Sequence, residues 1–167
     1  MRILGIDPGL NVTGYGVIQQ TKEGIKIIEA GTIKTSSAKN ISTRLNIIYS
    51  QVLDLIKETK PKVCILEKLY SHYKHPITAI LMGHARGAIV LATSLTNLKL
   101  VSYPAKTVKR AVTGNGNASK QQVQRTVESI LNLKHTNNPE DITDALALCL
   151  THIYHSKEID IKYDIKD

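Results

Sequence analysis

Four acidic residues lie where a site that acts on phosphate esters would need them. Asp7 and Glu67 each follow directly on a short apolar run, and Asp141 and Asp144 lie three positions apart in a late apolar segment. A carboxylate just past the buried part of a strand points into the crevice where open α/β sheets keep their sites. Several carboxylates there would repel one another unless divalent cations neutralised them, and oxygen ligands suit magnesium or manganese. The pattern therefore predicts metal-dependent phosphoryl-transfer chemistry.

The two strand-end acids also have structural explanations. Asp7 opens the sequence Asp-Pro-Gly, which is common in turns, and Glu67 could instead form a salt bridge with Lys68 or Arg86. A carboxylate beside a buried strand is costly without a partner, which favours a functional interpretation of Glu67. Three glycines near Asp7 would let a phosphodiester backbone approach the sheet: Gly9, Gly14 and Gly16.

The two late acids, Asp141 and Asp144, differ in how strongly their positions indicate a metal site. Asp141, with Glu140, falls in the first turn of an expected helix, where acids complement the helix dipole. Asp144 lies beyond that turn and borders the run 145–150, which is apolar on every face. Residues three apart share a helix face, so Asp141 and Asp144 could address the same metal ions.

The charge of the chain indicates a polyanionic partner. Lys and Arg total 22 against 14 Asp and Glu, a net charge of +8 and a pI near 9.5. Contacts between such side chains and phosphates dominate nucleic-acid affinity, although a solvated basic surface is the simpler alternative. Basic residues flank the loop 114–117, whose glycines and neighbouring helix starts offer N–H groups to phosphates: Lys106, Lys109, Arg110, Lys120 and Arg125. Tyr70 and Tyr73 could stack on an unpaired base or be ordinary surface tyrosines.

Other kinds of site are disfavoured. The pairs His72/His75 and His152/His155 have no cysteine near them, so zinc is not expected, and no phosphate loop or nucleophile elbow occurs. Cys64 and Cys149 lie in apolar runs and are expected to be reduced core residues of a cytoplasmic protein. We expect no signal peptide and no apolar stretch of the ~20 residues that a membrane span requires.

The elements that must position these acids follow from periodicity and punctuation. We expect strands at 2–7, 13–20, 25–35, 62–67 and 99–103. A first helix, capped by Ser36 or Ser37, should run to about Lys60, and the later helices are expected at 76–96, 104–112, 119–132 and from Asn138-Pro139 to about His155. Three antiparallel strands followed by alternating helices and strands predict an α/β fold of ribonuclease H-like type. It would contain a mixed five-stranded sheet with helices on both faces. We expect a nuclease domain at 1–156 and a flexible tail at 157–167.

Several motifs together resemble the bacterial RuvC family of Holliday junction resolvases, in order and spacing, over about residues 1–156. The motifs are Gly5-Ile6-Asp7-Pro8-Gly9, Thr13-Gly14-Tyr15-Gly16-Val17, Leu66-Glu67, Gly83-His84-Ala85-Arg86-Gly87 and Asp141-Ile142-Thr143-Asp144-Ala145-Leu146-Ala147.

The resemblance implies a homodimeric endonuclease that makes paired symmetric nicks in strands of like polarity of a four-way DNA junction, in recombination and repair. Asp7, Glu67, Asp141 and Asp144 would bind two magnesium ions per site, with manganese as a substitute. The nicks would carry ligatable 5′-phosphate and 3′-hydroxyl ends, and the cellular partner would be a branch-migration helicase of RuvA and RuvB type. The implied DNA contacts come from Lys109 and Lys120, with Tyr70 where the family has an aromatic wedge, commonly Phe.

Two alternatives from other classes stay open at this point. One is a junction-binding module without nuclease activity, against which the four intact carboxylates argue. The other is an ATPase related to actin and sugar kinases, because Asp-x-Gly followed by Thr-Gly suits nucleotide phosphate loops. Those ATPases clamp a nucleotide between two such domains, and 167 residues supply one.

Overall fold

The chain forms one mixed β-sheet covered by helices. The computed structural model describes residues 1–68, 76–133 and 140–163, and the side chains of the last helix as far as residue 156. The strands are β1 (Arg2–Asp7), β2 (Val12–Thr21), β3 (Gly24–Lys34), β4 (Val63–Glu67) and β5 (Lys99–Tyr103). The helices are α1 (Ile41–Thr59), α2 (Pro76–Leu95), α3 (Ala105–Thr113), α4 (Lys120–Ile130) and α5 (Glu140–Tyr163).

The strand order is β3-β2-β1-β4-β5. Strands β1, β2 and β3 pair antiparallel, and β4 pairs parallel with both β1 and β5. The short β1–β2 and β2–β3 connections force antiparallel pairing, whereas the helical crossovers return the chain in parallel. The predicted α/β sheet of three antiparallel strands followed by two parallel strands is therefore confirmed.

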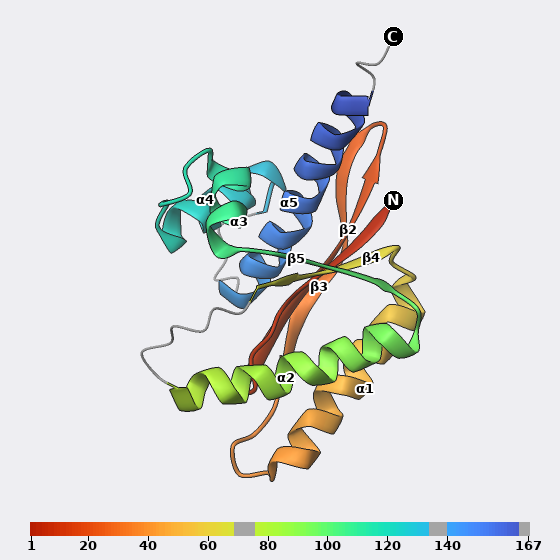
Figure 1. Cartoon of the computed structure of the whole chain (residues 1–167), viewed down its shortest axis with the longest axis vertical. Helices are drawn as coiled ribbons and strands as arrows, with labels where there is room; N and C mark the ends of the chain where they lie inside the picture. Colours follow the sequence, from red (N-terminus) through yellow and green to blue (C-terminus); the bar gives the residue numbers. More distant parts are fainter. Residues whose placement is uncertain (69–75, 134–139, 164–167) are drawn as a thin grey trace.

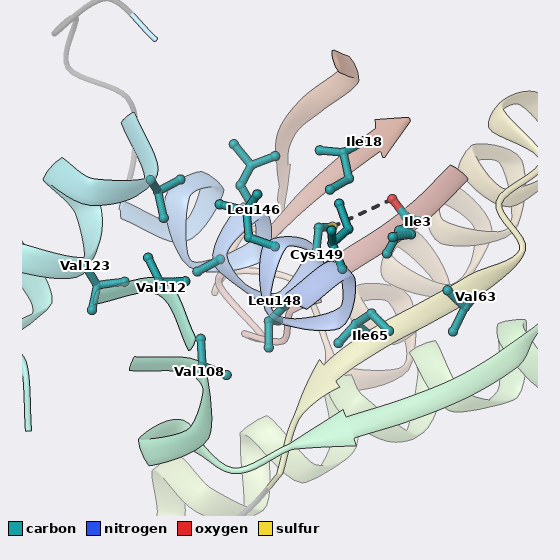
Figure 2. Packing of buried hydrophobic residues seen from close by; sticks show 14 of the residues in the cluster. Ile3, Ile18, Val63, Ile65, Val108, Val112, Val123, Leu146, Leu148 and Cys149 are labelled. Carbon is teal, nitrogen blue, oxygen red and sulfur yellow. Dashed lines mark hydrogen bonds between the residues drawn. The ribbon is translucent and has the colours of Figure 1, made fainter. Parts of the chain in front are cut away.

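The two faces of the sheet carry separate cores. On one face, α1 and α2 cover a cluster that includes Leu4, Leu66 and Ile89, and Figure 1 shows these two helices side by side. On the other face, α3, α4 and α5 cover a second cluster, in which Leu148 and Cys149 of α5 lie near Ile65 and Ile3 (Figure 2). Cys64 and Cys149 are both buried free thiols, as expected of core residues.

The first helix begins later than predicted. Its N-cap is Asn40, whose side-chain oxygen accepts a hydrogen bond from the Thr43 amide at 2.9 Å. Ser36 and Ser37, the predicted caps, instead belong to a turn before the helix, in which the Lys39 amide donates to the Ser36 carbonyl at 3.1 Å. The helix ends as expected before Pro61, with Lys60 in the left-handed conformation (φ 48°).

The last helix is longer than predicted. It continues past His155 to Tyr163, whereas its expected start at Asn138-Pro139 lies outside the described residues. Residues 164–167 also lie outside them. The division into a domain of 1–156 and a tail stays a prediction.

Two glycines of the sheet allow α5 to lie directly on it. A Cβ added at Gly5 would come within 2.1 Å of the Ala145 carbonyl oxygen, and one at Gly14 within 2.0 Å of the Asp141 carbonyl oxygen. At Gly16 a Cβ would meet the Leu146 side chain at 2.6 Å. The sequence interpretation of Gly14 and Gly16 was therefore wrong, because these glycines admit a helix of the same chain and not a phosphodiester backbone.

Helix α2 carries an exposed apolar stripe. Its four most exposed members, which we call the α2 stripe, are Ile77, Ile80, Leu91 and Leu95, with exposed fractions of 74%, 59%, 53% and 62%. Leu81 and Val90, which are outside this set, are each 36% exposed. By length and composition alone, the segment Ile77–Leu95 is long and apolar enough to cross a membrane, with a mean hydropathy of 1.3. The expectation that no apolar stretch reaches this length was thus wrong, although a single such helix is weak evidence of a span.

Candidate active site

Two strand ends and one helix start bring the predicted acids together. Asp7 and Glu67 end the neighbouring parallel strands β1 and β4, where Ile6 pairs with Leu66. Because parallel strands end at the same edge of a sheet, the two carboxylates emerge beside each other. The contact at Gly14 brings the first turn of α5 to the same edge, and Asp141 and Asp144 with it.

A hollow of about 340 Å³ lies over these strand ends, between the sheet and helices α3 to α5. Asp7, Glu67 and Asp144 line it together with Lys109 and Lys120. Asp141 lines a second, adjoining hollow instead, on the side of the β1–β2 turn and α2. The acids thus stand between two depressions of the surface, one of which has a basic rim.

Burial and mutual repulsion raise the pKa values of Asp7, Glu67 and Asp144. Burial, and then the carboxylates of Asp144, Glu67 and Asp141, raise the pKa of Asp7 from 3.8 to about 7, against the opposing effect of Lys120. Burial and the Asp144 carboxylate likewise raise the pKa of Glu67, although Lys109 and Lys120 oppose this. The raised values mean that nearby cations only partly offset the negative charge of the cluster.

Among the described residues, Lys120 forms ion pairs with two acids at this site. Its Nζ lies 3.0 Å from Glu140 Oε2 and 3.1 Å from Asp144 Oδ2. Burial disfavours the charged ammonium, but the two carboxylates prevail and raise the pKa of Lys120. From the sequence, Glu140 was expected only to complement the helix dipole, and no signal in the sequence pairs it with a lysine on another helix.

Arg86 supports the end of β4. Its guanidinium donates to the main-chain carbonyl of Glu67 at 2.6 Å and to Ser102 Oγ at 2.9 Å. These bonds tie the ends of β4 and β5 together beneath the carboxylate of Glu67. The contact that Arg86 makes with Glu67, for which a salt bridge was considered, is thus to the main chain.

The donor set of the site fits a divalent cation. Carboxylate oxygens are the ligands that magnesium prefers, and here they carry negative charge that their neighbours leave partly unbalanced. Within the described parts of the chain, however, no three His, Cys, Asp or Glu side chains form a ready-made metal site. One oxygen of the Asp144 carboxylate, Oδ2, is held by Lys120 Nζ at 3.1 Å.

The remaining predicted contact residues fall into two groups. Lys106 and Arg110 lie exposed on α3, next to the hollow that Lys109 lines but not in its wall. Tyr70 and Tyr73 lie outside the described residues, and so do His72 and His75. Of the second histidine pair, His152 bonds through Nδ1 to the Tyr103 hydroxyl at 2.9 Å, and the His155 ring contacts the Tyr103 ring.

The raised pKa of Asp7 predicts a pH-dependent cost to stability. An ordinary aspartate is ionised above about pH 4, whereas folded Asp7 resists ionisation up to about pH 7. The stabilisation of the fold that neutral Asp7 contributes is therefore fully present below pH 4 and is lost as the pH rises through 7. Without metal, Asp7→Asn is expected to raise the free energy of unfolding by a few kcal/mol at pH 8 and by little at pH 4.

Thermal unfolding at both pH values measures this difference. Asp54→Asn, at an exposed acid of α1, is the matched control. Magnesium should reduce the difference in stability between Asp7→Asn and the wild-type protein at pH 8, because it would stabilise the wild-type protein. An equal gain for Asp7→Asn at pH 4 and pH 8 would contradict the electrostatic explanation.

The sheet order and the acidic crevice define a nuclease of the ribonuclease H-like class. A sequence model of the family described as crossover junction endodeoxyribonuclease RuvC matches residues 3–152. The chain therefore belongs to the RuvC family. It is an enzyme of the endonuclease type, and the ATPase alternative falls away.

Individual relatives match over nearly the whole chain. The RuvC of Caldicellulosiruptor saccharolyticus is 41% identical over 161 residues, which cover 95% of this chain and 96% of that protein. The RuvC of Thermosipho melanesiensis is 43% identical over 148 residues, covering 89% and 94%. Among solved structures, T. thermophilus RuvC in complex with a Holliday junction substrate superposes with a TM-score of 0.87, at 30% identity and with 95% and 96% coverage.

Proposed function

We propose that this chain resolves four-way DNA junctions by cutting two strands of like polarity symmetrically. The observation that carries the proposal is the hollow in which Asp7, Glu67 and Asp144 face Lys109 and Lys120. Acids at its floor suit a cation-assisted attack on a phosphodiester, and lysines at its rim suit the phosphates on either side. The similar T. thermophilus protein, which was solved with a Holliday junction, supports the choice of substrate.

Asp7, Glu67, Asp141 and Asp144 would hold the metal, which we propose to be two magnesium ions with manganese as a substitute. Bound divalent cations supply the charge that activates water and stabilises the leaving oxygen of a phosphodiester. Asp7, the most buried contributor, would fix the position of the metal from the sheet. Asp141 and Asp144 would close the site from α5, and their rigid helical spacing would orient both carboxylates.

Lys109 and Lys120 would position the DNA backbone. Lys109 lies in the wall of the hollow, together with Asp7 and Glu67. Lys120, which pairs with Glu140 and Asp144 here, would donate to a phosphate oxygen of the bound strand. Lys106 and Arg110 would extend this basic path along α3, and Tyr70 remains the proposed base wedge. The products would carry 5′-phosphate and 3′-hydroxyl ends.

A homodimer accounts for paired cuts, because a two-fold junction matches a two-fold protein. The α2 stripe would provide the apolar surface for it, since large exposed apolar patches mark interaction sites. The cellular setting that we propose is the cytoplasm, where a branch-migration helicase of RuvA and RuvB type would deliver the junction.

The proposal is tested by incubating the purified protein with an end-labelled mobile four-way junction and a matched linear duplex, with magnesium or with a chelator. Symmetric nicks that ligase can reseal, confined to the junction with magnesium, are the expected result. Binding without nicks in both magnesium and manganese would favour the nuclease-silent alternative. Cutting of the linear duplex alone would refute the junction assignment.

Junction affinity should depend steeply on salt. Each phosphate contact releases counterions, so raising the salt concentration from about 50 to 200 mM is expected to weaken binding at least tenfold. Binding measured without magnesium isolates this effect from cleavage. A flat response would contradict the role of the basic rim.

A further inference from the structure

The second hollow, of about 380 Å³, adjoins the acids on the side away from the lysines. Its walls are the turn residues Gly9 to Val12, three residues of α2 (Thr78, Leu81 and Met82), and Asp141. The volume falls in the range of about 300–1,000 Å³ typical of small-ligand sites. None of the described residues that line it is basic. This groove, which we call the turn groove, therefore offers hydrogen-bonding and apolar contacts beside the Asp141 carboxylate.

Helix α2 contributes to the turn groove with the face that it otherwise buries. Thr78 and Met82 precede Ala85 and Ile89 at helical spacing, and the latter two are fully buried against the sheet. The α2 stripe lies on a different face of the helix. A dimer formed through that stripe would thus leave Thr78 and Met82 available to a ligand.

A buried arginine fixes the turn that forms the opposite wall. Arg44 of α1 is only 8% exposed, and its Nε donates to Thr35 Oγ1 at 2.8 Å. The Thr35 hydroxyl donates in turn to the Leu10 carbonyl at 2.6 Å, and the Thr35 amide donates to the Asn11 carbonyl at 3.0 Å. Thr35 and Arg44, both distant from the turn in sequence, thereby hold the turn that follows Asp7.

Arg44 also orients the side chain of Asn11. Its Nη2 donates to Asn11 Oδ1. Arginine has only donors, so the amide atom that it contacts must be the oxygen. The Nδ2 group of Asn11 is thus directed away from Arg44. Asn11 is exposed and lines the turn groove, where this group can donate to a ligand.

We propose that the turn groove holds the nucleotide next to the scissile phosphate, and that the Asn11 amide donates a hydrogen bond to an acceptor atom of that nucleotide. Arg44 is then a positioning residue that acts through Asn11. The inference rests on the proposed function, because it assumes a DNA strand running across the acids. The lysine-lined hollow accepts the phosphates on one side of the cut, and the apolar side chains of Leu81 and Met82 suit a sugar or base on the other.

Asn11→Asp tests the contact with little change of shape. The new carboxylate can still accept from Arg44, but it presents an acceptor to the groove where the amide presented a donor. Single-turnover cleavage of the preferred junction is expected to fall about tenfold. Asn46→Asp, at an exposed position of α1, adds the same charge elsewhere and serves as the control.

A junction library with a randomised core shows whether the acceptor atom belongs to a base or to the sugar-phosphate backbone. A changed sequence preference in Asn11→Asp places the acceptor on a base edge, and a uniform loss places it on the sugar-phosphate backbone. Cleavage and preference equal to those of Asn46→Asp would overturn the inference. Failure of the proposed function is distinct, since the wild-type protein would then leave junctions uncut.

Arg44→Lys tests the positioning role. Lysine keeps the charge but cannot bond Thr35 and Asn11 together in the planar geometry of a guanidinium. Assayed well below its melting temperature, this variant should shift cleavage in the same way as Asn11→Asp, in rate and in sequence preference. A lower melting temperature with wild-type rate and preference would show a purely structural role and refute the positioning claim.

Discussion

Asp7→Asn is expected to lower junction cleavage by about a thousandfold, which corresponds to about 4 kcal/mol of transition-state stabilisation. Asparagine matches aspartate in shape but removes the charge from the most strongly shifted acid of the cluster. The fold should persist, because the repulsion among the acids decreases. Single-turnover cleavage in magnesium measures the loss.

Junction affinity separates this prediction from a general defect. Binding without metal should be unchanged or tighter in Asp7→Asn, since one negative charge near the phosphates is gone. Asp54→Asn again serves as the control and should cut at the wild-type rate. If Asp7→Asn lost affinity and cleavage to the same extent, Asp7 would be a DNA-binding or folding residue, and its metal-binding role would be refuted.

Ile80→Asp is expected to convert the proposed homodimer to a monomer. Ile80 lies in the α2 stripe, 59% exposed in the single chain. A carboxylate there would be buried twice in a two-fold interface, once from each subunit, without a cationic partner. The dimer dissociation constant should rise at least a hundredfold, about 3 kcal/mol. Sedimentation equilibrium over a range of concentrations measures it.

The monomer should also lose coordination between the two cuts. Nicks in a cruciform plasmid would then appear singly, whereas the dimer would linearise the plasmid within one encounter. Ile28→Asp provides the control, because Ile28 is an exposed isoleucine of β3 outside the stripe. A dimer unchanged by Ile80→Asp would show that the subunits meet through another surface.

The positions of the acids in the fold could be predicted because they depend on local signals. An apolar run that ends in a carboxylate marks the edge of a sheet, and Asp7 and Glu67 both lie at such an edge. The start of α1 could not be predicted equally well, because Ser36, Ser37 and Asn40 are all good capping residues. Only the hydrogen bond from Thr43 to Asn40 decides between them.

Contacts between distant segments escaped sequence analysis for a different reason. Arg44 reaches Asn11 across 33 positions, and Lys120 reaches Glu140 from another helix. Neither pair follows a helical or strand period, so no pattern in a single sequence indicates it. The glycines were misinterpreted likewise, since a missing Cβ does not indicate what occupies the space.

The direct seating of α5 on the sheet bears on how the site responds to heat. Around Gly5 and Gly14 the main chain of the helix rests on the main chain of the strands, with no rotatable side-chain bond in between. Rotamer changes in the core therefore do not alter the separation between Asp7 and the two acids of α5. Warming should broaden the motion of the side chains around the carboxylates before it changes the spacing of the backbone that carries them.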